Sequence, residues 1–339
     1  MVPGLDGAVV AERSSRRVLD VDELTVEFTA GRKVGRAVDR VSFGVDAGEV
    51  LGIVGESGSG KSMTAMAILG LIHPPGRVAS GSIQFQGRDL RLLSAQELRK
   101  IRGRDVAMIF QDPMSSMNPV ITVGSQIVEA IRLHRPNIST AAARTRAIEL
   151  LDLVRVPDAA RRARQYPHEL SGGLRQRSMI AMAIANEPAL LIADEPTTAL
   201  DVTIQAQILD LLQEIQLRSN RAMIIITHDL GVLAEYAHRV LVMYAGRIVE
   251  RGEVDRVLAA PTHPYTAGLL KCVMRSDRSV RDLNPIPGAP PSIFRKPSGC
   301  AFHPRCALCR ELCTTEEPAL TAQHGGSHSA CHFAAELQG

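Results

Sequence analysis

The segment 55–62 reads Gly-Glu-Ser-Gly-Ser-Gly-Lys-Ser and matches the pattern G-x-x-x-x-G-K-[ST]. An apolar run precedes it and a helix-like stretch follows, as in a strand–loop–helix phosphate site. Such a loop wraps backbone N–H groups around phosphate oxygens, because glycine carries no Cβ. We expect Lys61 to contact the β- and γ-phosphates and Ser62 to ligate Mg²⁺. The loop residues expected at the phosphates are Gly55, Glu56, Ser57, Gly58, Ser59 and Gly60. The alternative, a glycine-rich turn without function, does not explain this context.

Two adjacent acids end a second apolar run, 190–193. Asp194 lies at the end of this predicted buried strand, where it can hold Mg²⁺ directly or through water. Glu195 points to the other face and can polarise an attacking water as general base. The acids could instead form a solvated strand end, but a phosphate-binding loop in the same chain favours a nucleotide site.

The elements that position these groups follow from short apolar runs that alternate with helix-like stretches. Buried strands that alternate with helices indicate an α/β fold with a largely parallel sheet. The periodic residues Ala147, Leu150, Leu151 and Val154 predict one buried helix face. Strands are expected at 24–28, 41–54, 81–89, 106–110, 190–193, 222–227 and 240–244, and a further helix at 174–184.

Composition excludes several classes of protein. The chain has 339 residues, 45% apolar and 22% charged, which is ordinary for one large or two smaller globular domains. A net charge of +3 is too balanced to predict nucleic-acid binding, and 3% aromatic residues argue against base-stacking surfaces. No run of about 18 apolar residues predicts a membrane span, and the first 17 residues do not resemble a signal peptide. Six cysteines are few for this length and favour a reducing compartment.

Further motifs appear in a fixed order along the chain. Segment 170–177, Leu-Ser-Gly-Gly-Leu-Arg-Gln-Arg, resembles the signature motif of the ATP-binding cassette (ABC) superfamily. Gln111 resembles its Q-loop residue, segment 199–201 its D-loop, and His228 its switch histidine. Together with the phosphate-binding loop, these motifs span residues 28–228 in the family's order.

The resemblance implies a fold and a division of the chain. The expected fold is α/β, a P-loop NTPase with a RecA-like core, an antiparallel β subdomain, an inserted α-helical subdomain and a small Cys-rich C-terminal extension. The expected parts are a flexible tail (1–19), the first part of the ATP-binding core (20–112), the helical subdomain with the signature motif (113–176), the second part of the core (177–260) and the C-terminal extension (261–339).

The resemblance also implies roles for single residues. His228 would hydrogen-bond the γ-phosphate, and Gln111 would contact Mg²⁺ and water, so both join Glu195 as catalytic candidates. Asp201 would belong to the nucleotide site. Phe28 would stack on adenine, although an aromatic residue in a strand can also be a core residue.

The signature motif implies a second subunit. Ser171, Gly172 and Gly173 would begin the helix at 174–184, whose exposed N–H groups form a second anion site. If this site and the phosphate-binding loop face apart within one chain, a second cassette must supply it. Two cassettes would then bind head to tail around two ATP molecules.

Finer sequence details narrow the resemblance. Segments 55–57, 111–114, 197–203, 263–266 and 299–306 are similar to those of the ATPase subunits of oligopeptide and dipeptide importers. This similarity covers about residues 20–335. It implies a second, usually non-identical ATPase, two transmembrane permease subunits, an external peptide-binding protein, no nucleic acid, and a peripheral location at the cytoplasmic face of the plasma membrane. The alternatives are a soluble ABC ATPase of DNA repair or translation and the ATPase of an exporter.

The C-terminal cysteines leave three alternatives open. Cys300, Cys306, Cys313 and Cys331 match the positions that ligate a [4Fe–4S] cluster in some members of the importer family, and four thiolates are what such a cluster needs. Cys309 adds a Cys-x-x-Cys spacing with Cys306 that also suits tetrahedral zinc. The third alternative is a segment without metal.

Overall fold

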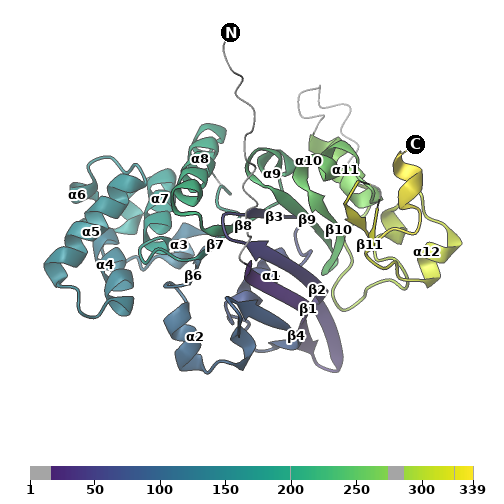
Figure 1. The fold of residues 1–339 in the computed structure, drawn as a ribbon, viewed down its shortest axis with the longest axis horizontal. Helices are drawn as coiled ribbons and strands as arrows, with labels where there is room; N and C mark the ends of the chain where they lie inside the picture. Colours follow the sequence, from purple (N-terminus) through teal and green to yellow (C-terminus); the bar gives the residue numbers. More distant parts are fainter. Residues whose placement is uncertain (1–16, 199, 274–285, 324, 339) are drawn as a thin grey trace, which may run out of the picture.

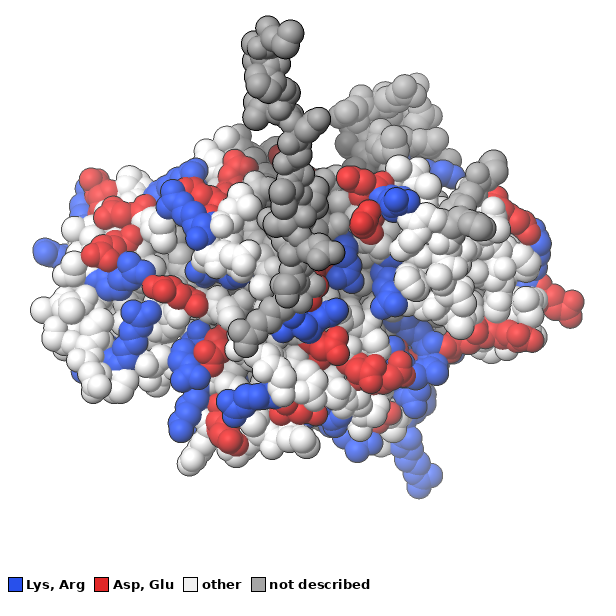
Figure 2. All heavy atoms as spheres, in the orientation of Figure 1, with Lys and Arg blue, Asp and Glu red and all other residues white. Residues whose placement is uncertain are grey.

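The structure is a computed structural model, and it describes residues 17–198, 200–273, 286–323 and 325–338. Figure 1 shows two sheets in the middle of the molecule and a group of helices at one end. At the other end lie the described residues from 261 onward, which we call the C-terminal segment. Lys and Arg side chains intermingle with Asp and Glu on the face drawn in Figure 2.

The larger sheet carries the nucleotide-site motifs. Its strands are β3 (Val50–Val54), β6 (Val106–Ile109), β7 (Leu190–Asp194), β8 (Ala222–Thr227), β9 (Arg239–Tyr244), β10 (Arg247–Glu253), β11 (Thr321–Ala322) and β12 (His328–Ser329). They lie in the order β11-β12-β10-β9-β3-β8-β7-β6. The five strands from β9 to β6 are parallel, and the other pairs are antiparallel. Every residue of β3, β7 and β8 is buried, as expected for a sheet covered on both faces. The predicted α/β fold is confirmed.

The second sheet is wholly antiparallel. Its strands are β1 (Arg17–Ala30), β2 (Lys33–Asp46), β4 (Gly76–Phe85) and β5 (Arg88–Asp89), in the order β2-β1-β4-β5. Residues 17–19 belong to β1 and not to a loose tail, because Leu19 is fully buried and pairs with Val45 and Phe85. The single strand expected at 41–54 is also wrong. Strand β2 ends at Asp46, and a turn with Gly48 at a φ of 74° leads into β3.

The helices are α1 (Lys61–Ile68), α2 (Ala95–Ile101), α3 (Pro113–Ser116), α4 (Val123–His134), α5 (Thr140–Leu153), α6 (Ala159–Arg162), α7 (Gly172–Ala183), α8 (Val202–Ser219), α9 (Leu230–Tyr236), α10 (Val254–Ala259), α11 (Pro264–Val273) and α12 (Glu311–Thr315). Helices α3 to α7 lie between β6 and β7 in the chain and form the helical end of Figure 1. The predicted apolar face is buried on α5. The predicted subdomain boundary at residue 176 falls inside α7. Among the described residues, none of the helices combines the length and apolarity that crossing a membrane requires.

The C-terminal segment is joined to the larger sheet through β12, which pairs with β10. At this junction the fully buried carboxylate of Glu250 accepts hydrogen bonds from the N–H and hydroxyl of Thr262 (2.6 and 2.7 Å) and from the N–H of His263 (3.0 Å). Burial raises the pKa of Glu250 and lowers the pKa of His263 to about 3. This polar network anchors the start of α11 to the sheet.

Candidate active site

The phosphate-binding loop joins β3 to α1, and its glycines are required by its shape. Gly55 and Gly60 have φ angles of 156° and 106°. A Cβ on Gly55 would lie 2.2 Å from the carbonyl oxygen of Met243, and one on Gly60 would lie 2.6 Å from that of Ala37. Any other residue at these positions would push the loop away from the neighbouring backbone.

The last two residues of the loop turn inward. Lys61 is buried, and its Nζ donates to the carbonyl oxygens of Gly55 (2.6 Å) and Glu56 (3.0 Å). Burial lowers the pKa of Lys61, while nearby carboxylates oppose this shift. The Ser62 hydroxyl donates to Oδ1 of Asp194 (3.1 Å). A hydroxyl beside a carboxylate at the carboxyl ends of β3 and β7 is an oxygen-rich position of the kind Mg²⁺ prefers.

Asp194 and Glu195 have different surroundings although they are adjacent. Asp194 is buried, and this burial raises its pKa. Glu195 has a φ of 45°, an uncommon backbone conformation for a non-glycine residue, and its N–H donates to the carbonyl of Ile226 (2.8 Å). Such local backbone strain concentrates at functional sites.

The Glu195 carboxylate is the meeting point of the catalytic candidates. Its Oε2 accepts hydrogen bonds from Gln111 Nε2 and from the Thr198 hydroxyl, each at 2.9 Å. Its Oε1 lies 3.7 Å from Nδ1 of His228. The structure therefore brings together Glu195, Gln111 and His228, three residues that are far apart in the sequence. Thr198 is an additional partner that the sequence argument did not single out as a site residue.

The signature residues lie on a different part of the molecule. Ser171 precedes α7 and makes no side-chain hydrogen bond to the helix, and Gly172 and Gly173 form its first turn. Within the described residues, no hydrogen bond or ion pair joins these three residues to the loop 55–62. Asp201 caps α8 by accepting a hydrogen bond from the Ile204 N–H (3.0 Å).

Phe28 lies near the end of β1, paired with Gly35 and Gly76. Its ring covers Gly76, where a Cβ would lie 2.6 Å from the ring. The side chain packs against the apolar core of the antiparallel sheet. The expected stacking on adenine therefore stays a prediction.

Two residues of the C-terminal segment reach the phosphate-binding loop and were not predicted from the sequence. Arg305 donates from Nη1 and Nη2 to the two carboxylate oxygens of Glu56, at 2.6 and 2.9 Å. The Tyr265 hydroxyl accepts a hydrogen bond from the Glu56 N–H at 2.7 Å. The partners are 249 and 209 residues apart in the chain, so no local pattern could have linked them.

Four cysteines of the C-terminal segment line one cavity, namely Cys300, Cys306, Cys313 and Cys331. The pKa of the Cys300 thiol is raised to about 11, first by burial and then by the other three thiols of the cavity. Cys309 is exposed and does not line the cavity. In the part of the chain that the structure describes, no three His, Cys, Asp or Glu side chains are grouped so that they could hold a metal ion.

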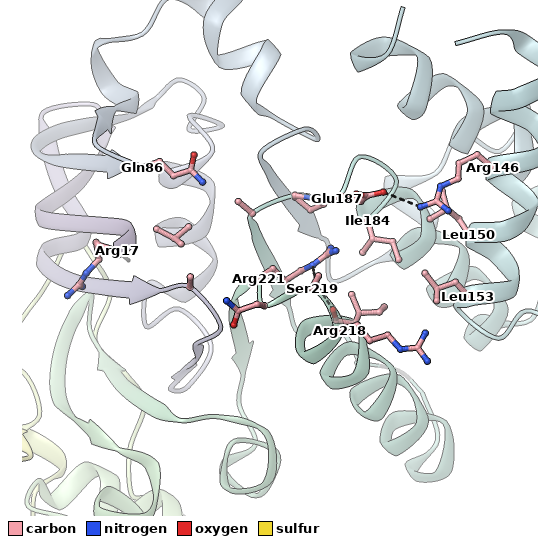
Figure 3. A pocket seen from close by; sticks show the side chains of 16 residues that line it. Arg17, Gln86, Arg146, Leu150, Leu153, Ile184, Glu187, Arg218, Ser219 and Arg221 are labelled. Atoms are coloured by element: carbon pink, nitrogen blue, oxygen red, sulfur yellow. Dashed lines mark hydrogen bonds and ion pairs between the residues drawn. The ribbon is translucent and has the colours of Figure 1, made fainter. Parts of the chain in front are cut away.

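Another cavity, of about 550 Å³ (Figure 3), lies at the amino ends of the parallel strands of the larger sheet. The candidate site residues lie at the opposite, carboxyl ends of these strands. The lining of this cavity includes Ala47 before β3, Ala189 before β7 and Arg221 before β8, and an Arg146–Glu187 contact (3.2 Å) at its rim. Ligands of open α/β sheets bind at the carboxyl ends of the strands. None of the predicted site residues lines this cavity. The candidate active site is therefore the one at the carboxyl ends of β3, β7 and β8.

Comparison with known proteins yields two family matches. Residues 38–198 match the family model described as ABC transporter, and residues 249–313 match the one described as Oligopeptide/dipeptide transporter, C-terminal region. The second match contains Tyr265, Arg305 and three of the cavity cysteines.

Curated relatives match nearly the whole chain. It is 52% identical over 316 residues to the Dipeptide transport ATP-binding protein DppD of Escherichia coli (strain K12), which covers 93% of this chain and 96% of that protein. It is 48% identical over 324 residues to the Oligopeptide transport ATP-binding protein OppD of Salmonella typhimurium (strain LT2), which covers 96% of each.

Solved structures share the fold of about 70% of the chain. A bacterial ABC transporter cassette in dimeric form has a TM-score of 0.64 and 28% identity, and the match covers 70% of this chain and 98% of that one. The cbiO1 protein of Clostridium perfringens, part of the ABC transporter complex cbiONQ, has a TM-score of 0.60 and 27% identity, with 72% and 91% covered.

Proposed function

This chain belongs to the family of dipeptide and oligopeptide transport ATP-binding proteins of the ABC transporters, and we propose that it hydrolyses ATP to power peptide uptake through separate permease subunits. One observation carries this proposal. The segment that matches the peptide-transporter C-terminal region contacts the phosphate-binding loop. That loop belongs to the same chain in which Gln111 hydrogen-bonds Glu195. The exporter and soluble alternatives have no such support.

The nucleotide would bind at the carboxyl ends of β3, β7 and β8. The loop N–H groups and Lys61 would hold the phosphates, and Ser62 and Asp194, 3.1 Å apart, would hold Mg²⁺ together with Gln111. The metal, when bound, neutralises charge on the phosphate oxygens. Glu195 would orient and deprotonate the attacking water, and His228 would hydrogen-bond the γ-phosphate.

A second ATPase subunit would complete the site. The N–H groups at the start of α7 lack a side-chain cap, and a helix start of this kind favours an anion. Because, in the described part of the chain, Ser171, Gly172 and Gly173 make no backbone hydrogen bond to their own phosphate-binding loop, we propose that they serve the ATP bound by the partner. The partner is a second ATPase of the same family, identical or non-identical.

A groove of about 320 Å³ offers a docking place for a permease. Apolar side chains dominate it, and they come from the end of α1, from β6 and from the helical group, including Leu71, Met108, Phe110, Leu133 and Met182. Leu133 on α4 is 64% exposed. The groove is close in the chain to Gln111, so a permease helix seated here could sense the nucleotide site. A chain bound in this way would lie at the cytoplasmic face of the membrane.

Leu133→Asp tests this docking surface. Placing a carboxylate in an apolar interface removes contact area and leaves a charge without a partner, so we expect ATP-dependent dipeptide uptake by cells to fall about tenfold or more. The ATPase rate of the isolated chain should be unchanged. Leu217→Asp is the matched control, since Leu217 is 69% exposed on α8 outside the groove. Normal uptake by the Leu133 variant, or an equal loss in the control, would contradict the proposed docking surface.

We propose that the four cysteines of the cavity bind a [4Fe–4S] cluster and not a single ion. Each iron of a [4Fe–4S] cluster takes one thiolate, so the thiolates need not converge on one point. We therefore propose Cys300, Cys306, Cys313 and Cys331 as the cluster ligands. The free volume between these side chains is about 20 Å³, room for about one water molecule. Such a cluster would supply a rigid cross-link of the segment.

Elemental analysis of anaerobically purified protein tests the cysteine cavity. The wild type is expected to contain about four irons and four acid-labile sulfides per chain, with visible absorption. Cys313→Ser should lose this iron and sulfide. Cys309→Ser is the matched control and should retain both, because Cys309 lies outside the cavity. One zinc without sulfide, or loss of iron in the Cys309 variant, would contradict the assignment.

A further inference from the structure

Glu56, the second residue of the phosphate-binding loop, is held by the C-terminal segment through both its side chain and its backbone. Arg305 binds its carboxylate with two parallel hydrogen bonds of 2.6 and 2.9 Å. The Tyr265 hydroxyl accepts the hydrogen bond of its N–H at 2.7 Å. We call Arg305 and Tyr265, bound to Glu56, the loop clamp.

All three nitrogens of the Arg305 guanidinium donate hydrogen bonds. Besides Glu56, its Nε donates to the carbonyl of Pro287 (2.8 Å), and its Nη1 and Nη2 donate to the Tyr244 hydroxyl and the carbonyl of Ile286, both at 3.3 Å. Only 5% of the side chain is exposed. Ion pairing with Glu56 raises the pKa of Arg305, so it stays charged. A planar, bidentate contact of this kind fixes direction as well as distance.

The position of Tyr265 is equally fixed. Its ring is fully buried and packs on Tyr244 and Phe302, with centroid distances of 4.7 and 5.4 Å. Its N–H donates to Nδ1 of the buried His263 (3.1 Å). Burial raises the pKa of Tyr265, so the hydroxyl is neutral. Both arms of the loop clamp are therefore rigid groups set in the packed interface between the segment and the larger sheet.

The loop clamp reaches the nucleotide-binding lysine through a single residue, Glu56. The carbonyl oxygen of Glu56 accepts hydrogen bonds from Lys61 Nζ (3.0 Å) and from the Ser59 N–H (3.1 Å). The same residue thus receives the segment on its side chain and N–H and presents its carbonyl to the loop. A shift of Glu56 would therefore change the position of the Lys61 ammonium group and of the first turn of the loop.

We infer that Arg305 and Tyr265 are positioning residues for ATP binding, which hold the phosphate-binding loop in its binding-competent shape through Glu56. They do not touch the phosphates themselves. This inference rests on the proposed function, because it assigns the C-terminal segment a role at the same ATP site. The C-terminal segment would then contribute to nucleotide binding by the cassette.

Nucleotide affinity measured on the full chain tests the loop clamp. The probe is the non-hydrolysable analogue adenylyl imidodiphosphate with Mg²⁺, titrated by calorimetry. Tyr265→Phe keeps the ring packing and removes the one hydrogen bond, so we expect about 3- to 10-fold weaker binding. Arg305→Ala should weaken binding at least about tenfold, and Arg305→Lys should fall between it and the wild type, because lysine cannot bind both oxygens in parallel.

Arg310→Ala is the matched control in the same segment. Arg310 pairs with Glu336, lies over the Phe333 ring and is 51% exposed. An exposed ion pair contributes little, so binding should stay within about twofold of the wild type. If Arg305 acts through Glu56, adding Glu56→Gln to Arg305→Ala should cause less further loss than Glu56→Gln alone causes.

Thermal unfolding separates positioning from plain stabilisation. A residue that only stabilises the fold lowers the unfolding midpoint and leaves the affinity of the folded protein unchanged. Wild-type affinity in both Tyr265→Phe and Arg305→Lys would overturn the inference. Failure of the wild type itself to bind the analogue would instead overturn the proposed ATPase function, and the inference with it.

Discussion

Glu195→Gln is expected to bind ATP normally and to lose at least about 100-fold in the rate of hydrolysis, because general base catalysis contributes about 10²- to 10⁴-fold. Glutamine has nearly the same shape and keeps one oxygen that can accept the bond from Gln111 or Thr198 (each 2.9 Å in the wild type). It cannot take a proton from water. Steady-state ATPase assays and a nucleotide-binding titration measure the two effects separately.

The Glu195→Gln variant is also expected to change how the cassettes assemble in the presence of ATP. Because the ATP-bound state should persist, the variant is expected to accumulate as a nucleotide-bound pair of cassettes, visible by size-exclusion chromatography with ATP. Glu253→Gln is the control, since Glu253 is 72% exposed at the end of β10. Hydrolysis by the Glu195 variant at the wild-type rate would show that another group activates the water.

Lys61→Ala is expected to weaken ATP binding about 100-fold or more. The ammonium group can make at least two contacts to phosphate oxygens, each stabilising by about 1.5–3 kcal/mol, and every 1.4 kcal/mol is tenfold in affinity. In the structure Nζ rests on the carbonyl oxygens of Gly55 and Glu56. The substitution also removes both of these hydrogen bonds from the loop, although the Glu56 carbonyl keeps the bond from the Ser59 N–H.

Fluorescence titration with a nucleotide analogue measures this effect. Lys100→Ala is the matched control, because Lys100 is an exposed lysine on α2. Near-normal affinity in a folded Lys61 variant would mean that the phosphates bind elsewhere, and it would remove the basis for the site at the carboxyl ends of β3 and β7.

The sequence predicted the parts of the site that are local. The loop 55–62 can be recognised because its function depends on consecutive backbone groups, and Gly55 and Gly60 lie against neighbouring backbone as that shape requires. Asp194 and Glu195 were recognisable as acids at the end of an apolar strand. Gln111 and His228 came from resemblance alone, and the structure places both beside Glu195.

Other features depend on contacts that no short pattern encodes. The contacts of Glu56 with Arg305 and Tyr265 join residues more than 200 positions apart, and they arise only when β10 and the C-terminal segment pack together. The start of β1 was missed because its burial depends on pairing with distant strands. The turn at Gly48 has a local signal that could have been used, because Asp46, Gly48 and Glu49 interrupt the apolar residues of 41–54.

Uptake of a radiolabelled dipeptide by cells shows whether ATP hydrolysis at Glu195 drives peptide import. Cells would lack the chromosomal gene and carry either the wild-type chain or Glu195→Gln, together with the native permeases and binding protein. The wild type is expected to restore energy-dependent uptake, and the variant, present in equal amount, is expected not to. Equal uptake in both strains, or in cells without the chain, would contradict the claim that ATP hydrolysis at Glu195 drives peptide import.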